Sequence, residues 1–327
     1  MISASIFSPL NPQLHIPDGF LNTVVALVFW LLTIVFVSIA TRRLQADYDE
    51  RLTPLMGILA AFIFAAQMIN FPVAGGTSGH LLGGALAAVV LGPWAAILVM
   101  TAVIAAQAIL FQDGGLLVMG ANIFNMGILT ALIGFGLYRS AAGRSRRTKL
   151  IAVTAAAWLS VMAGALSTSL QLWISGTTTL KIVMPTMLGI HALIGIGEAL
   201  ITVGAIAFIM QTRPDLLSDE KITAKGGRLW IVVGGVITLL VVLLAPFASV
   251  SPDGLERVAE DLGFLNTSID APYQLLPDYS IPFLGETTLS TVVAGAIGIL
   301  AVAGLVLLLA RTLRKASLPT KHRQPTE

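Results

Sequence analysis

Long uninterrupted apolar runs constrain this chain more than any other feature of its sequence. Of its 327 residues, 56% are hydrophobic and only 11% are charged. Backbone amides inside a bilayer must be hydrogen-bonded within the spanning structure, and these runs are too long and continuous for barrel strands. We therefore predict an all-α polytopic membrane protein. The predicted apolar segments are 21–40, 54–70, 81–111, 116–138, 150–174, 184–210, 229–249 and 288–310.

The segment 81–111 is too long to be one membrane helix. At 1.5 Å per residue it would extend roughly 45 Å, against about 30 Å of hydrocarbon. The pair Gly92-Pro93 interrupts it, because proline removes an amide donor and disfavours a helical residue before it. We predict a short helix over 81–91, a turn, and a second helix over 93–111.

Basic residues set the number of passes and the orientation. Three groups of basic residues should lie in the cytoplasm under the positive-inside rule. A single pass through 81–111 would leave one of these groups outside, so we predict nine passes with the N-terminus outside and the C-terminus inside. The groups are Arg42, Arg43 and Arg51; Arg139, Arg144, Arg146, Arg147 and Lys149; and Arg311, Arg314, Lys315, Lys321 and Arg323.

A change in composition divides the chain. The charged stretch 211–228 is interpreted as a cytoplasmic linker between a seven-helix domain over 14–210, which includes the short helix after His80, and a two-helix appendage over 229–311. The appendage carries an external loop, 250–286, in which Leu255–Leu262 is predicted to form a short amphipathic helix after a turn. Residues 1–13 form an extension of doubtful status, and residues 312–327 form a basic cytoplasmic tail.

Two histidines are the best candidates for a metal site. The predicted topology brings His15 and His80 to the same external edge, although 65 positions separate them. The chain has no cysteine, so a metal would be held by nitrogen or oxygen. Asp18 is the only acidic residue that the sequence places near this pair, and with Gly19 it is interpreted first as an N-terminal turn.

Several motifs carry a family resemblance. HIPDGFL, QMINFPVAGGTSGHLLGGALAAVVLGP, QAILFQDGGLLVMGANIFNMG and HALIGIGEA span residues 15 to about 199. They resemble the NikM/CbiM type of substrate-binding membrane subunit in energy-coupling-factor importers for nickel and cobalt. The remainder, with PDGLERVAEDLGF, PDY and LSTVVAGAIG, resembles the NikN-like PDGLE accessory subunit, here fused behind the binding subunit.

The resemblance implies a ligand set. Residue by residue, the family's metal ligands correspond to the amine of Leu14, the amide and imidazole nitrogens of His15, and the imidazole of His80. Four nitrogens in a plane suit Ni²⁺ or Cu²⁺ far better than hard, oxygen-seeking cations. Both imidazoles must be neutral to bind, so acid should release the metal.

Position 14 departs from the family pattern, because thirteen residues precede it and Leu14 then has no free amine. The extension MISASIFSPLNPQ lacks the pattern of a secretory signal peptide. Our hypothesis is that translation starts at codon 14, read as initiator methionine, or that proteolysis trims the chain before Leu14.

Other polar residues have two readings each. Buried amides in helices form interhelical hydrogen bonds or orient the histidines. His191 and Glu198, seven residues apart on one helix face, are either a functional pair inside the membrane or a structural one, and Gly195 and Gly197 allow close helix packing. Gly75, Gly76 and Gly79 should let the loop before His80 fold tightly. The amides are Gln67, Asn70, Gln107, Asn122 and Asn125.

The function implied by the resemblance is capture of a transition-metal cation, Ni²⁺ before Co²⁺, in an inner or plasma membrane. No phosphate-binding loop is present, so this chain is not expected to hydrolyse ATP itself. The resemblance implies that a transmembrane coupling subunit and a cytoplasmic ATPase pair supply energy as separate chains. No cofactor and no nucleic acid is expected. The alternatives are a Co²⁺ importer subunit supplying cobalamin synthesis, a secondary metal transporter, and a membrane metalloenzyme, which would need an open metal position and a base.

Overall fold

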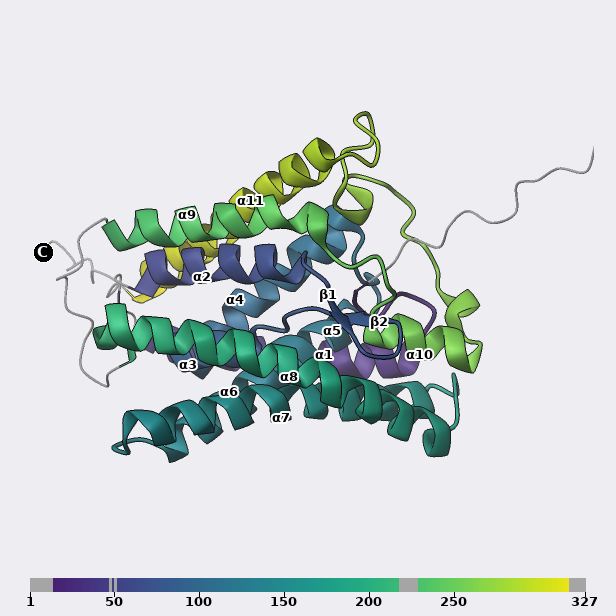
Figure 1. The fold of residues 1–327 in the computed structure, drawn as a ribbon, viewed down its shortest axis with the longest axis horizontal. Coiled ribbons are helices and arrows are strands. Elements are labelled where there is room, and N and C mark those ends of the chain that lie inside the picture. The colour runs from purple at the N-terminus through teal and green to yellow at the C-terminus, as the bar shows by residue number, and fades with distance from the viewer. Residues whose placement is uncertain (1–13, 47–48, 50–51, 218–228, 318–327) are drawn as a thin grey trace, which may run out of the picture.

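A computed structural model describes residues 14–46, 49, 52–217 and 229–317 (Figure 1). The extension 1–13, residues 218–228 of the predicted linker, and residues 318–327 of the tail lie outside this part. The described residues form helices in all the predicted apolar segments, so the all-α membrane fold is confirmed. The helices are α1 (Thr23–Ala46), α2 (Leu52–Gln67), α3 (Gly84–Leu91), α4 (Pro93–Ala106), α5 (Met119–Asn122), α6 (Thr130–Ser140), α7 (Arg146–Ile174), α8 (Leu180–Thr212), α9 (Leu229–Leu244), α10 (Gly254–Leu262) and α11 (Thr288–Ser317).

Seven helices in the described part are long and apolar enough to cross a membrane. Two of them contain π-helical turns: α4 continues through Gln107–Phe111, and α5 and α6 join through Ile123–Leu129. The two shorter helices, α2 and α3, lie among the others. The spanning stretches are Thr23–Ala46, Pro93–Phe111, Met119–Ser140, Arg146–Ile174, Leu180–Thr212, Leu229–Phe247 and Thr288–Arg314.

The short helix predicted after His80 is present as α3. Its C-cap Gly92 has φ +79°, in the left-handed region that glycine adopts without steric cost, and Pro93 is the first residue of α4. All residues from Gly84 to Val90 are buried. α3 packs between α4, α6 and α7 rather than facing lipid.

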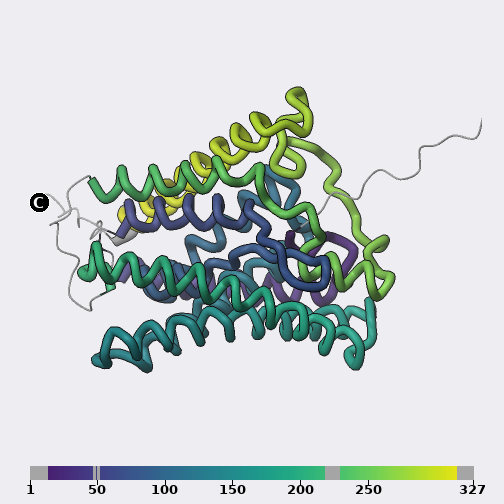
Figure 2. The backbone as a smooth tube through the Cα atoms, viewed as in Figure 1, coloured from purple at the N-terminus to yellow at the C-terminus, as the bar shows by residue number. Residues whose placement is uncertain are grey.

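α9 and α11 pack against α2 and complete one side of the bundle (Figure 2). The approach is close: a Cβ at Gly298 of α11 would lie 2.1 Å from the ring of Phe64. The core runs along α2, α3, α4 and α6. α1 instead leaves apolar side chains such as Leu27, Leu31 and Ile34 exposed, as a lipid-facing helix does.

The described basic helix ends gather at one end of the bundle. Arg43 is in the last turn of α1, Arg139 in the last turn of α6, and Arg147 in the first turn of α7. These helix ends lie on the same side as the C-terminus of α11, opposite the β-strands and α10 (Figure 1). The assignment of this basic end to the cytoplasm remains a prediction.

The opposite end contains a β-hairpin that the sequence did not predict. Strands β1 (Phe71–Val73) and β2 (Thr77–Gly79) form an antiparallel hairpin in the segment before His80. Its turn uses Gly75 and Gly76, which have φ +89° and +71°. β2 lies beside α8, where a Cβ at Gly79 would meet Ile194 at 2.6 Å. The hairpin therefore places the chain that leads to His80 directly against α8.

The loop 250–286 crosses this same end. Its helix α10 begins with a capping box, in which Asp253 accepts a hydrogen bond from the Glu256 amide at 2.7 Å. The predicted helix 255–262 is thus present and starts one residue earlier. The loop is tied to the hairpin, since the Ser78 amide donates to the Pro252 carbonyl at 2.8 Å, and to the N-terminal segment, since the Ile269 amide donates to the Asp18 carbonyl at 2.7 Å.

Candidate metal-binding site

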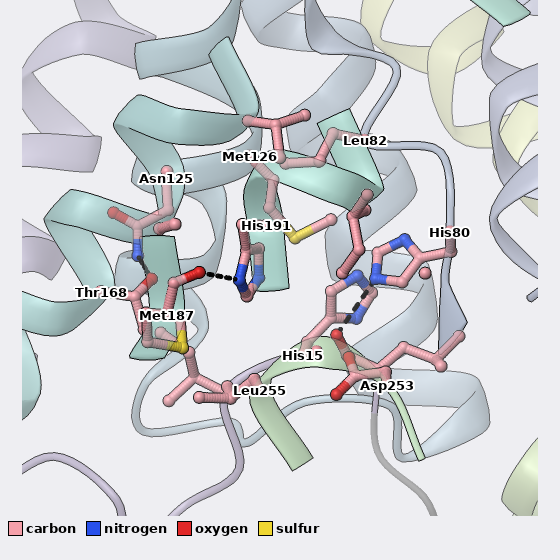
Figure 3. Close-up of a pocket in the computed structure, with 18 of the residues that line it drawn as sticks. His15, His80, Leu82, Asn125, Met126, Thr168, Met187, His191, Asp253 and Leu255 are labelled. Atoms are coloured by element: carbon pink, nitrogen blue, oxygen red, sulfur yellow. Dashed lines mark hydrogen bonds between the residues drawn. The ribbon is translucent and has the colours of Figure 1, made fainter. Parts of the chain in front are cut away.

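His15 and His80 line one cavity of about 70 Å³ beneath the loop 250–286 (Figure 3). Residues of the N-terminal segment, the β2–α3 connection, α8 and α10 all contribute to its wall. The two imidazole rings are buried, at 2% and 8% exposure, with centroids 5.6 Å apart in an edge-to-face arrangement. The fold therefore brings together the two histidines that the topology had placed at one edge.

Three nitrogen-bearing groups approach two oxygen atoms, one of which is shared. The Leu14 amide donates to Oδ1 of Asp113 at 2.8 Å, and Nδ1 of His15 lies 3.1 Å from the same oxygen. Nε2 of His80 lies 3.2 Å from the Leu14 carbonyl oxygen. Nε2 of His15 is buried and has no hydrogen-bond partner among the described residues. The nitrogens of Leu14, His15 and His80 are thus within a few ångströms of one another.

Asp113 is the acid at the centre of this arrangement. It follows the π-helical end of α4, and its Oδ2 accepts a hydrogen bond from the Tyr279 hydroxyl at 2.5 Å. Gln107 donates from Nε2 to the same hydroxyl at 3.2 Å. Tyr279 belongs to the loop 250–286, so the two-helix appendage is linked to the histidines through the Asp113 carboxylate.

Burial and charge act in opposite directions on the pKa values here. Burial disfavours the charged forms of both His15 and Asp113, but their mutual attraction outweighs it, raising the pKa of His15 and lowering that of Asp113. Burial and the neighbouring His15 lower the pKa of His80. Burial raises the pKa of Asp253, at the start of α10, to about 8. Both causes favour the neutral form of His80.

The expectation that Asp18 is the only acid near the histidines is wrong. Asp113 contacts His15, and Asp253 lines the cavity. Asp18 instead accepts the Val118 amide at 3.1 Å and fixes the N-terminal segment to the chain after Asp113. In the sequence Asp113 is 98 positions from His15. The sequence did contain a signal for Asp113: it is the acid followed by two glycines in FQDGG. This stretch is part of a motif that carries the family resemblance, but no role was predicted for its acid.

Two of the predicted amides hold the backbone beside a histidine. Asn122 accepts the Ile16 amide at 3.1 Å and donates to the Ile16 carbonyl at 3.0 Å, next to His15. Gln67 donates to the Leu82 carbonyl at 2.9 Å, two residues after His80. Both contacts fix main chain rather than an imidazole ring.

The other amides lie further from the rings. Asn125 of the π-helical segment bonds Gln171 of α7 through both of its side-chain atoms, at 3.0 and 2.7 Å. The main-chain carbonyl of Asn70 accepts the Ser249 amide at 2.7 Å. Gln107 reaches the histidines only through Tyr279 and Asp113.

The structure separates His191 from Glu198. The His191 ring lines the cavity, whereas Glu198 accepts the Leu82 and Gly83 amides at 2.6 and 3.1 Å, at the start of α3. No contact joins these two side chains in the described part of the chain. Gly197 and Gly195 bring Phe71 and Trp158 close to α8.

The described residues bring no three His, Cys, Asp or Glu side chains into a metal-ligating group. A metal held by His15 and His80 would therefore need further donors, and the main-chain nitrogens of Leu14 and His15 are candidates in the same segment. Such a set of nitrogens is suited to holding a late transition-metal cation as a substrate.

Comparison with known families agrees with these observations. Residues 15–216 match the family model of CbiM, the cobalt uptake substrate-specific transmembrane region, and residues 228–315 match the PDGLE domain. A putative fused nickel transport protein NikMN of Archaeoglobus fulgidus is 36% identical over 93% of this chain and 100% of its own length. The fused nickel transport protein NikMN of Rhodobacter capsulatus is 32% identical over 69% of this chain and 71% of its own.

A solved structure supports the fold. The crystal structure of a transition metal transporter is 31% identical, covers 66% of this chain and 99% of its own, and superposes with a TM-score of 0.55. The fused relatives and the two matched models together account for nearly all of the chain. This chain belongs to the CbiM family, with a PDGLE domain behind the CbiM region, and is a multi-pass nickel/cobalt transport subunit rather than an enzyme.

Proposed function

We propose that this chain captures Ni²⁺ as its transported substrate, with the nitrogens of Leu14, His15 and His80 as ligands. The observation that carries the proposal is the convergence of these groups. The Leu14 nitrogen and Nδ1 of His15 approach the same oxygen of Asp113, and Nε2 of His80 approaches the Leu14 carbonyl. A small rearrangement would point all of them at one ion.

Asp113 also supports the requirement for a free amine at position 14. A buried carboxylate 2.8 Å from the Leu14 nitrogen pairs better with a charged amine than with a peptide amide. The proposal therefore includes a mature chain that begins at position 14, by initiation there or by trimming. Intact-mass measurement on the membrane-extracted protein tests this; a mature chain beginning at Met1 would contradict it.

Nickel is proposed before cobalt for two reasons. Planar nitrogen ligation with a main-chain amide favours Ni²⁺, and two fused relatives are named nickel transport proteins. Calorimetric titration of the full chain with each metal distinguishes them. Tighter binding of Co²⁺ than of Ni²⁺ would favour the cobalt importer instead.

The capture site is tested by His15→Ala with His80→Ala. Removing two of the proposed ligands should weaken Ni²⁺ binding by at least about 100-fold, because loss of a residue that only hydrogen-bonds a ligand already lowers metal affinity roughly 10–100-fold. The measurement is the same titration, with His322→Gln as a control that removes a histidine elsewhere. Tight binding by the double variant would show that the ligands lie elsewhere.

Energy for transport is proposed to come from partner chains: a transmembrane coupling subunit and a pair of cytoplasmic ATPases. In the proposed cycle the ion is captured at the external end, the loop 250–286 holds the site together, and ATP-driven reorientation of this subunit exposes the ion inward. Radiolabelled nickel uptake in cells with and without the partner subunits tests the coupling. Uptake that is indifferent to loss of the ATPases would indicate a secondary transporter.

A further inference from the structure

A third histidine lines the cavity of the capture site and has no role there. His191 lies on α8, and its Nδ1 is 2.8 Å from the Met187 carbonyl one turn earlier. A carbonyl oxygen only accepts, so Nδ1 carries the hydrogen. In the neutral ring Nε2 then keeps a free lone pair, which is the form in which histidine binds metals.

The free edge of this ring faces the cavity. Among the described residues none donates a hydrogen bond to Nε2, and the edge opposite Met187 is turned toward His15 and His80 (Figure 3). The first residue of α10 packs close to this edge and has no side chain that would crowd it: a Cβ at Gly254 would lie 3.2 Å from Nε2. At about 70 Å³ the cavity also exceeds several-fold the roughly 10–15 Å³ that one water needs.

Two neutral, soft donors lie on this side of the cavity. Met126 and Met187 line the same cavity with their thioethers, on either side of the His191 ring (Figure 3). Asn125 and Thr168 form the wall beyond them. An imidazole with thioether neighbours suits a late transition-metal ion and discriminates against Mg²⁺ and Ca²⁺. Neutral ligands without a chelate also hold such an ion less tightly than the capture site would.

We propose that Nε2 of His191 forms a second, weaker Ni²⁺ site, to which the ion passes from His15 and His80 on its way through the protein. The inference rests on the proposed capture function and deepens it. Two features support the direction of transfer: His191 shares its cavity with the capture ligands, and it lies inside a membrane-spanning helix whereas His15 and His80 do not.

Equilibrium binding tests the site by itself. The full chain in lipid nanodiscs is titrated with Ni²⁺ alone in the His15→Ala, His80→Ala background. We expect one remaining weak site, and at least a roughly 10-fold further loss when His191→Gln is added. Met187→Leu in the same background keeps the carbonyl that orients the ring and should weaken binding less. A weak site that persists without His191, or no weak site at all, overturns the inference.

Uptake tests the transit role. His191→Gln alone should still bind one Ni²⁺ at the capture site, while uptake at saturating nickel falls at least roughly 10-fold; His322→Gln should match the unaltered chain in both. Unchanged uptake by His191→Gln overturns the transit role. Failure of the capture proposal would give a different result from failure of the transit role. The His15→Ala, His80→Ala variant would then retain tight Ni²⁺ binding, both with His191 and with His191→Gln.

Discussion

At the scale of single residues, the pairing of His15 with Asp113 decides how the site responds to acid. In the proposed capture site Ni²⁺ would bind only the neutral imidazole, so it would have to displace the proton that Asp113 helps His15 to hold. A raised pKa means that His15 becomes protonated at a higher pH than a free imidazole. Nickel affinity should therefore begin to fall, as the pH is lowered, above the ordinary histidine value of 6.5.

Asp113→Asn tests this assignment. The amide keeps an oxygen that can accept from the Leu14 nitrogen but removes the charge that raises the pKa of His15. The pH at which nickel affinity has fallen by half should shift to lower values. The measurement is Ni²⁺ titration of the full chain across pH 5–8. An unchanged pH midpoint would mean that Asp113 does not control His15.

At the scale of elements, α8 holds the segment that carries His80. The carboxylate of Glu198 accepts the Leu82 and Gly83 amides at the N-terminus of α3, where free amide groups need an acceptor. On the other side of the same segment, Gln67 of α2 donates to the Leu82 carbonyl. His80 is therefore positioned by two helices through the main chain that follows it.

Glu198→Gln should loosen this segment. The glutamine has one acceptor oxygen for two amides, and its NH₂ group would face the other, so we expect a loss of about 1–2 kcal/mol in stability. Nickel affinity should fall with it, by roughly 10-fold. Thermal unfolding and titration of the full chain measure both. Glu260→Gln, on the exposed side of α10, is the matched control, and an equal effect there would contradict the assignment.

A further link joins the loop 250–286 to the site through Tyr279. Tyr279 and its neighbour Asp278 have φ of +54° and +49°, a left-handed conformation that is uncommon outside glycine and costs energy. The strained conformation occurs at the residue whose hydroxyl donates a hydrogen bond to Asp113. The conformation is thus found at the point where the PDGLE domain contacts the candidate metal site.

Tyr279→Phe removes only that hydroxyl. Oδ2 of Asp113 then loses its partner in a buried site, and we expect Ni²⁺ affinity to fall roughly 10-fold while the chain still folds. Tyr273→Phe, in the same loop and with no partner for its hydroxyl among the described residues, should bind as the unaltered chain does. Equal binding by the two variants would show that the loop does not act through Tyr279.

At the scale of the whole molecule, the membrane-spanning helices were predictable from the sequence. In an apolar solvent the backbone amides and carbonyls of each span must be hydrogen-bonded within the protein, and this requirement acts on each apolar segment by itself. Gly92-Pro93 marked the turn after α3 for a similarly local reason. The contacts of the site were not local. Tyr279 and Asp113 are 166 positions apart, and Asp113 and Leu14 are 99 apart. The hairpin β1–β2 was missed because its strands of three residues carry no clear alternation.

The hydrogen bonds that tie the loop 250–286 to the hairpin have a consequence for kinetics. Ser78 holds Ser251 and Pro252 over the cavity, and Asp253 and Gly254 form part of its wall. An ion held in the proposed capture site would lie between two residues that are themselves only 2% and 8% exposed. Its residence time would then depend on how often this loop lifts, and slow release would follow even where each nitrogen ligand contributes modestly.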